Sequence, residues 1–176
     1  MSASARSELG LDPLAALSPW DYAGHLGVVV LDFDALGVSA ACREQLLERD
    51  PDSWSGMTLK EGDITAILIN PVHGRPRQCS TLMHELAHIL LRHVPNSVQV
   101  SSTGMLLLSD FSADQEDEAD WLAAAMLLPR DALILHRTGG RGVSDIAADF
   151  CVSEQLTEWR LRMTGVDLQL RRSGRR

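Results

Sequence analysis

The sequence lacks the features that mark secreted, membrane and disulfide-bonded proteins. It has only 3 cysteines in 176 residues, Cys42, Cys79 and Cys151, and no two of them form a CxxC pair. An odd, unclustered set is typical of a reducing compartment, and it predicts buried or idle thiols. The first 17 residues contain no continuous apolar segment of the kind found in signal peptides, and no apolar run approaches the roughly 18 residues of a membrane span. We therefore expect a soluble, cytoplasmic protein that does not contact a membrane.

Positive charge is also in short supply. The chain has 16 Lys and Arg against 24 Asp and Glu, which gives a net charge of −8. Binding to phosphates needs a positive surface, so this balance argues against a general nucleic-acid binder. Hydrophobic residues make up 45% and charged residues 23% of the chain, which is ordinary for a soluble globular protein. The length suits a single domain over residues 1–176.

Local patterns predict a mixture of helices and strands. Ser18 before Pro19 is expected to start a short helix that runs through His25, and Asp12 before Pro13 is expected to start another. The other predicted elements of the first half are a strand in the β-branched stretch 27–33, a helix over 40–49, and a hairpin with its turn at 60–63 and its better strand at 64–70.

One predicted helix carries three titratable side chains at a spacing that suits a metal ion. Residues 80–94 are typical of a mostly buried helix that a proline ends. His84 and His88 are four residues apart, so they lie on one face of the helix, where two imidazoles can hold one zinc ion. Glu85 flanks that face, where a general base acting on water belongs. An ordinary buried helix is the alternative, but shuffling this composition produces the HExxH spacing roughly once in a hundred chains.

A second predicted helix supplies carboxylates. Ser112 and Gln115 form a capping box that starts a helix within residues 110–129. Acidic residues in a first helical turn often only complement the helix dipole. That explanation does not suit Asp120, because apolar residues follow it and because it lies four residues after Glu116 on the same face. Such a pair can provide a third metal ligand and a carboxylate that orients a ligating histidine, which favours a metal site over a purely structural helix pair.

With these motifs the sequence resembles the ImmA/IrrE metallopeptidases of bacteria and their mobile elements, which are gluzincin-like. The resemblance rests on HELAH at 84–88 and on EDEADWLAAAMLLP, which begins 28 residues after the second histidine. The lead-in GDITAILINPVHGRPRQCSTLM and the distal IAADFCVSEQLTEWRLRMTG match the family more loosely. The resemblance therefore covers most of residues 20–165.

The resemblance implies a role for each residue of the two motifs. His84 and His88 would be zinc ligands, and Glu85 would be the catalytic base. Glu116 would be the third ligand, and Asp120 would lie behind the ligands and orient one of them. Many members of the family have Asn in place of Asp120, but an ExxxD helix resembles that of other zinc peptidases and suits the same site.

Two assignments stay open from the sequence. Glu118 is the rival of Glu116 as the third ligand. Zinc peptidases often use a further His, Tyr or Arg to stabilise the oxyanion of the tetrahedral intermediate. No residue is assigned to that role, because surface or structural roles are commoner for each of the candidates, which are Tyr22, His73, Arg77, His93 and His136.

Residues 144–164 have the outline of a helix-turn-helix motif. Glu154 and Glu158 lie on the face that a recognition helix would offer to phosphates, where acids repel DNA. We therefore expect a packing unit and no direct DNA binding. Residues 137–176 nevertheless contain eight Arg against five acidic residues. The alternative function is thus a non-proteolytic regulatory module that contacts a repressor or DNA, although a pure scaffold has no use for a base at Glu85.

Together these observations predict an α+β fold: a small, largely antiparallel sheet, a zincin-type pair of active-site helices and a helical C-terminal part. The ordered core is expected over 20–165, with flexible ends at 1–11 and 170–176. The predicted function is that of a zinc endopeptidase with one Zn²⁺ per chain, in which Glu85 moves a proton from water to the leaving amine.

The resemblance also implies a protein substrate. The expected partner is a DNA-binding helix-turn-helix repressor, cleaved at one or few bonds so that stress or mobile-element genes are released. We expect the strand at 64–70 to offer an exposed edge, to which an extended segment of the substrate adds as an extra strand.

Overall fold

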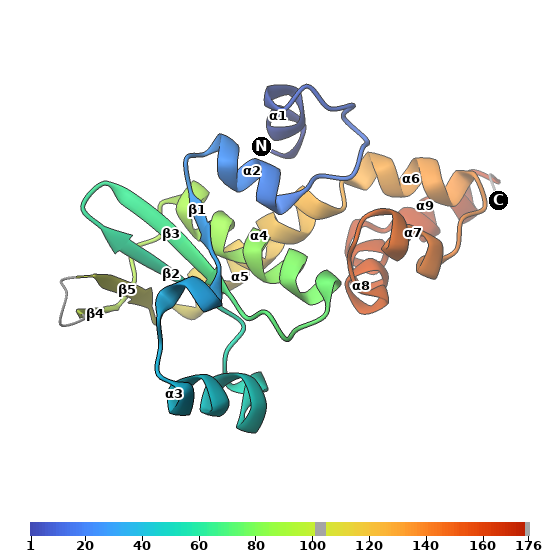
Figure 1. The fold of residues 1–176 in the computed structure, drawn as a ribbon. Coiled ribbons are helices and arrows are strands. Elements are labelled where there is room, and N and C mark those ends of the chain that lie inside the picture. Colours follow the sequence, from blue (N-terminus) through green and yellow to red (C-terminus); the bar gives the residue numbers. More distant parts are fainter. Residues whose placement is uncertain (101–104, 175–176) are drawn as a thin grey trace.

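Figure 1 shows a five-stranded sheet at one end of the molecule, a group of short helices at the other, and two longer helices running between them. This computed structural model describes residues 1–100 and 105–174. Within them the strands are β1 Val29–Leu31, β2 Gly56–Glu61, β3 Ile64–Ile69, β4 Ser97–Val100 and β5 Leu106–Ser109. The α-helices are α1 Ser2–Glu8, α2 Pro19–His25, α3 Ala40–Glu44, α4 Arg75–Leu91, α5 Ala113–Leu127, α6 Arg130–Thr138, α7 Val143–Asp149, α8 Glu154–Thr164 and α9 Val166–Arg172. Single turns of other helix types are η1 Phe33–Leu36, η2 Gln45–Arg49 and η3 Pro51–Ser53.

The sheet has the strand order β1-β3-β2-β5-β4, and only the β1–β3 pair is parallel. The prediction of an α+β fold with a largely antiparallel sheet is confirmed. The predicted hairpin is present as β2 and β3, which pair from Gly56 with Ile69 to Glu61 with Ile64. Gly62 makes its two-residue turn possible, because the backbone there takes a left-handed φ of 58°.

The expectation that the strand at 64–70 has an exposed edge is wrong. β3 is bordered on both sides, since Ala66 pairs with Val29 of β1 and with Leu59 of β2. Residues 66–69 of β3 are all buried, and an unbroken apolar run is typical of a central strand rather than an edge strand. Among the described residues, the outer strands of the sheet are β1 and β4.

Helix α4 packs on the sheet and begins earlier than predicted. Its first residue is Arg75 rather than residue 80, because Gly74 provides the N-cap and Pro76 suits the first turn. It ends at Leu91, where Arg92 takes a left-handed conformation. Close approach to β2 depends on Gly56, since a Cβ atom at that position would lie 2.6 Å from the Cγ2 of Thr81 on α4. Helix α4, which carries His84 and His88, is therefore held tightly against the sheet.

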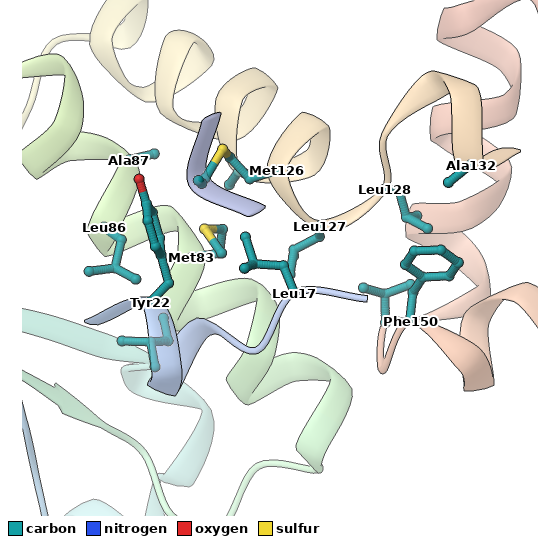
Figure 2. Packing of buried hydrophobic residues seen from close by; sticks show 14 of the residues in the cluster. Leu17, Tyr22, Met83, Leu86, Ala87, Met126, Leu127, Leu128, Ala132 and Phe150 are labelled. Carbon is teal, nitrogen blue, oxygen red and sulfur yellow. The ribbon is translucent and has the colours of Figure 1, made fainter. Parts of the chain in front are cut away.

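Helices α4 and α5 bury their apolar faces against each other and against the N-terminal segments (Figure 2). The side chains that meet there include Met83, Leu86 and Ala87 of α4 and Met126 and Leu127 of α5, all 0–1% exposed. Small side chains on α5 allow this close approach, and the alanines Ala119, Ala123 and Ala124 are buried. Truncating one of the larger side chains to Ala would cost about 2–5 kcal/mol of stability.

The N-terminal segment closes over the end of α5. Arg6 of α1 is fully buried, and its Nη2 donates to the backbone oxygen of Met126 at 2.9 Å. The helix predicted to start at Asp12 is absent, because the Asp12 side chain instead accepts from the Leu14 backbone N–H in a turn. Flexibility of residues 1–11 and 170–176 stays a prediction, and residues 175–176 lie outside the described part of the chain.

The C-terminal helices form a packing unit. The two helices predicted within 144–164 are present as α7 and α8, with Ser153 capping α8 by accepting from the Leu156 backbone N–H. Arg160 of α8 is buried, and its Nε and Nη2 both donate to the backbone oxygen of Leu128, just past the end of α5. In the described part of the chain, no helix is long and apolar enough to span a membrane.

Candidate metal centre

Three ligand-type atoms from two helices meet at one point. The Nε2 atoms of His84 and His88 on α4 are 3.0 Å apart. The Oε2 of Glu116, on α5, lies 3.1 Å from the first and 3.6 Å from the second. The i, i+4 spacing on α4 and the packing of α5 across it therefore bring together the three residues that the sequence singled out as ligands.

The geometry and chemistry of this cluster fit a zinc ion. Ligand atoms bound to tetrahedral zinc at 2.0–2.1 Å lie about 3.3 Å from one another, which is close to the three separations in the cluster. When each histidine donates a hydrogen bond from its Nδ1, its Nε2 carries a lone pair and no hydrogen. Both Nε2 atoms then face a carboxylate oxygen as acceptors. Three acceptors aimed at one point need a cation between them. Two imidazoles and a carboxylate also leave the fourth position of a tetrahedral site open.

A carboxylate behind His84 fixes the orientation of its ring. The Oδ1 of Asp120 lies 2.8 Å from the Nδ1 of His84, one helical turn beyond Glu116 on α5. The hydrogen bond and negative charges of the neighbouring acids outweigh burial and raise the pKa of His84, although burial is the largest single influence and acts in the opposite direction. The bond also lowers the pKa of Asp120, which stays ionised. Asp120 thus takes the position predicted for a carboxylate that orients a ligand.

A chain of two further side chains lies behind His88. The Nδ1 of His93 is 2.9 Å from the Nδ1 of His88, and the Nε2 of His93 is 3.1 Å from the Oε2 of Glu118. Phe111 stacks on the His88 ring with a centroid distance of 3.9 Å. Burial first, and then the charges of the neighbouring histidines, lower the pKa of His88 to about 4, so the ring is neutral as a metal ligand must be. Glu118, the rival third ligand, is therefore paired with His93 instead of joining the cluster.

The carboxylate of Glu85 is held from the sheet side. The hydroxyl of Thr58 on β2 donates to the Oε2 of Glu85 at 2.6 Å. Burial is the main reason that the pKa of Glu85 is raised, while the Thr58 hydrogen bond acts against the rise. Thr58 is itself only 3% exposed. Its role was missed in the sequence, because a threonine in a strand carries no local signal of its partner 27 residues away.

Comparison with known protein families agrees with this geometry. The family described as the IrrE N-terminal-like domain, peptidase M78, matches residues 46–162, which include both helices of the cluster. The chain belongs to this family. It is accordingly a metallopeptidase, and the resemblance noted from its two motifs is confirmed. No curated protein and no solved structure matches the chain.

Apart from His93, the residues of this M78 peptidase that were considered for stabilising the oxyanion make contacts away from the cluster. Tyr22 is buried in the core, and Arg77 donates to the Oδ1 of Asp52 at 2.6 Å. His73 contacts the backbone oxygen of Pro51, and His136 lies 3.7 Å from a carboxylate oxygen of Asp149. Of the five candidates, His93 is the one that the structure places beside a residue of the cluster.

A pocket of about 200 Å³ opens beside the cluster of His84, His88 and Glu116. His84 and Asp120 form part of its wall, and apolar side chains of α5 and α8, including Leu127, Leu156 and Trp159, form most of the rest. The C-terminal helices therefore contribute to the surroundings of the cluster, although all of its ligand-type atoms come from α4 and α5.

Proposed function

We propose that this metallopeptidase is a zinc-dependent endopeptidase of narrow specificity, with His84, His88 and Glu116 as the ligands of one Zn²⁺ per chain. The observation that carries the proposal is the convergence of the two Nε2 atoms and the Oε2 atom at separations of 3.0–3.6 Å. Glu85 follows His84 directly in the chain, and the charges of His84 and Glu116 act on its carboxylate, so a base is available near the cluster.

Each residue of the centre has a distinct part in the proposed reaction. A bound zinc ion would polarise the scissile carbonyl and lower the pKa of water. Asp120 orients His84, and His93 orients His88, so that both rings keep their Nε2 lone pairs aimed at one point. Glu85 accepts a proton from the attacking water and delivers it to the leaving amine, while Thr58 holds its carboxylate in place.

The proposed substrate is a DNA-binding helix-turn-helix repressor, and the proposed place of action is the cytoplasm. The support is the resemblance to ImmA/IrrE peptidases, whose members are associated with the cleavage of such repressors. A peptidase that works among the proteins of its own cell needs a narrow choice of bonds. Cleavage at an extended linker between domains would provide it, because folded proteins present few such segments.

The open edge of the sheet suits an extended substrate. Since β3 lies inside the sheet, the proposed docking strand is β4, whose outer side has no neighbouring strand among the described residues. Its side chains are exposed, with Val98 at 44% and Val100 at 66%. An added strand would gain backbone hydrogen bonds whatever its sequence, and the apolar pocket beside His84 would then select among side chains.

The alternative function, a regulatory module that acts through the C-terminal helices, has less support. Several arginines that give this region its positive charge are used within the protein. Arg137 pairs with Asp167 at 2.9 Å and Arg141 with Asp149 at 2.6 Å, while Arg160 is buried. These contacts favour a structural role for Arg137, Arg141 and Arg160.

The test is cleavage of a repressor encoded beside the gene for this chain. The zinc-loaded protein should cut the repressor at one or few bonds, a chelator should stop the reaction, and added zinc should restore it. The Glu85→Gln variant is the matched control and should not cleave the repressor. Incubation with casein tests how broad the substrate specificity is. Digestion of casein at many sites would refute narrow specificity, and an intact repressor in the presence of fully loaded protein would refute the proposed substrate.

A further inference from the structure

Two cysteines that are far apart in the chain are in contact in the fold. The Sγ atoms of Cys79 and Cys151 are 3.3 Å apart, although 72 residues separate them. Cys79 lies on α4, five residues before His84, and is 3% exposed. Cys151 lies in the turn between α7 and α8 and is half-buried. The third cysteine, Cys42, is exposed on α3.

The backbone at Cys151 is unusual for a residue with a side chain. Its φ is 53°, in the left-handed region that glycine or asparagine usually occupies just past the end of a helix. Two hydrogen bonds hold the turn there: the Cys151 N–H donates to Ala148, and the Val152 N–H donates to Ala147. Glycine would be less strained at position 151. The turn nevertheless carries a cysteine, whose thiol is held against the thiol of Cys79.

We propose that Cys79 and Cys151 form an oxidisable thiol pair, which hydrogen peroxide converts into a disulfide joining α4 to the turn between α7 and α8. A disulfide bond is about 2.0 Å long, so the two sulfur atoms have to approach by only about 1.3 Å. In a reducing compartment the bond would form during exposure to peroxide and be reduced again afterwards.

The reaction has two steps. The Cys151 thiolate, the more exposed of the pair, attacks one oxygen of the peroxide; the O–O bond breaks, hydroxide leaves and takes up a proton as water, and Cys151 becomes a sulfenic acid. The Cys79 sulfur then attacks the Cys151 sulfur, the S–O bond breaks, and the Cys79 proton leaves with the hydroxyl as a second water. Two thiols are thereby oxidised and one peroxide is reduced to two waters.

The order of the steps follows from the surroundings of the two thiols. Burial, together with the neighbouring Cys151 sulfur, raises the pKa of Cys79 to about 12, so Cys79 keeps its proton until the sulfenic acid is in place. Its Sγ already donates toward Cys151, the atom with which it would react. Cys79 is accordingly the resolving thiol and Cys151 the one that meets peroxide.

The disulfide would join two parts of the fold that border the pocket beside the metal centre. His84 of α4 lines one side of that pocket, and Leu156 and Trp159 of α8 line another. A covalent link between α4 and the turn that leads into α8 limits how far these walls can separate. It also closes a long loop, which stabilises the folded chain by restricting the unfolded one.

The experiment uses the full chain with Cys42→Ser, which removes the exposed thiol and leaves two. Peroxide should lower the free thiols from two per chain to none, and dithiothreitol should restore both. Trypsin cuts after Arg77, Arg92, Arg141 and Arg160, so each thiol lies in its own peptide, and mass spectrometry should find peptides 78–92 and 142–160 linked. The oxidised protein should also unfold several degrees higher than the reduced one.

Single variants test the order of the steps. With Cys79→Ser, peroxide should leave Cys151 as a sulfenic acid that dimedone traps; with Cys151→Ser, Cys79 should stay reduced. If either variant fails to fold, the search for linked peptides in the Cys42→Ser protein still tests whether Cys79 and Cys151 form a disulfide. Two free thiols after peroxide, or Cys151 driven to a sulfinic acid while Cys79 stays reduced, would overturn the proposal. Neither outcome depends on the metal or on peptidase activity.

Discussion

The hydroxyl of Thr58 donates a 2.6 Å hydrogen bond to the carboxylate of Glu85. This bond joins strand β2 to helix α4, so the base of the proposed reaction is fixed by the sheet, while His84 is oriented by Asp120 of α5 and His88 by His93, which follows α4. The base and the ligands are therefore positioned independently of each other. Substitutions are expected to separate proton transfer from metal binding.

Replacing Glu85 by Gln should abolish peptide cleavage and leave the zinc content near one per chain. Gln keeps the size and the Thr58 contact of the side chain but cannot accept the proton, and loss of a general base alone costs about 100- to 10,000-fold in rate. Cleavage assays and metal analysis on the same preparation give both readings. A Glu85→Gln protein with undiminished activity would rule out the proposed mechanism.

Thr58→Val should lower kcat while zinc content stays unchanged. Valine has nearly the shape of threonine but donates no hydrogen bond, so the Glu85 carboxylate would lose the contact that holds it. Thr58→Ser is the matched control, because it keeps the hydroxyl and should retain most of the activity. Equal losses in both variants would show that packing in β2, rather than the hydrogen bond, is what matters.

The two glutamates of α5 should differ in their effect on zinc. Glu116→Ala removes a proposed ligand and should lower zinc affinity by more than the roughly 10- to 100-fold that is typical of residues behind the ligands. Glu118→Ala removes only the partner of His93 and should leave most zinc bound. Competition with a chromogenic chelator measures both affinities, and the reverse order would move the third ligand to Glu118.

His93→Phe should weaken zinc binding by about 10- to 100-fold, because the His88 ring loses the partner of its Nδ1. The phenyl ring still fills the space beside Phe111, so the fold should survive. His25→Phe, at a histidine that pairs with Glu8 on the surface, should leave the affinity unchanged. Unchanged affinity in the His93 variant would show that His88 needs no such support.

Duplex DNA should bind weakly and without sequence preference, and the binding should fade as salt is added. The reason is the acidic start of α8 at Glu154 and the internal use of Arg137, Arg141 and Arg160. Binding to matched and scrambled duplexes over a salt series measures this. A sequence-specific footprint at moderate salt would instead support the regulatory module.

Much of the metal centre could be predicted because its geometry is local. Four-residue spacing on a helix is enough to bring His84 and His88 onto one face, and the same rule pairs Glu116 with Asp120. The spacing to Asp120 also favoured Glu116 over Glu118 as the third ligand. What the sequence could not show is the partner of Glu118, since the contact with His93 depends on how α5 crosses α4.

Contacts between distant parts of the chain were harder to foresee. The parallel pairing of β1 with β3 places each residue of a three-residue strand against a partner 37 positions away, which hides an edge that the hairpin alone would expose. Thr58 reaches Glu85, and Cys79 reaches Cys151, by the same kind of long-range packing. The three cysteines looked idle because their spacing in sequence does not reveal which of them meet.

The strand order β1-β3-β2-β5-β4 has a consequence for how the protein folds. Between the last histidine of α4 and the glutamate of α5, the chain leaves the helix pair, runs through β4 and β5, of which β5 pairs with β2, and then returns to α4. Non-local pairing of this kind is slow to form, because the entropy of closing the loop is lost before any contact compensates for it. We therefore expect His84, His88 and Glu116 to come together late in folding. Amide protons of α4 and α5 should accordingly gain protection from exchange together, as one cooperative unit, rather than helix by helix.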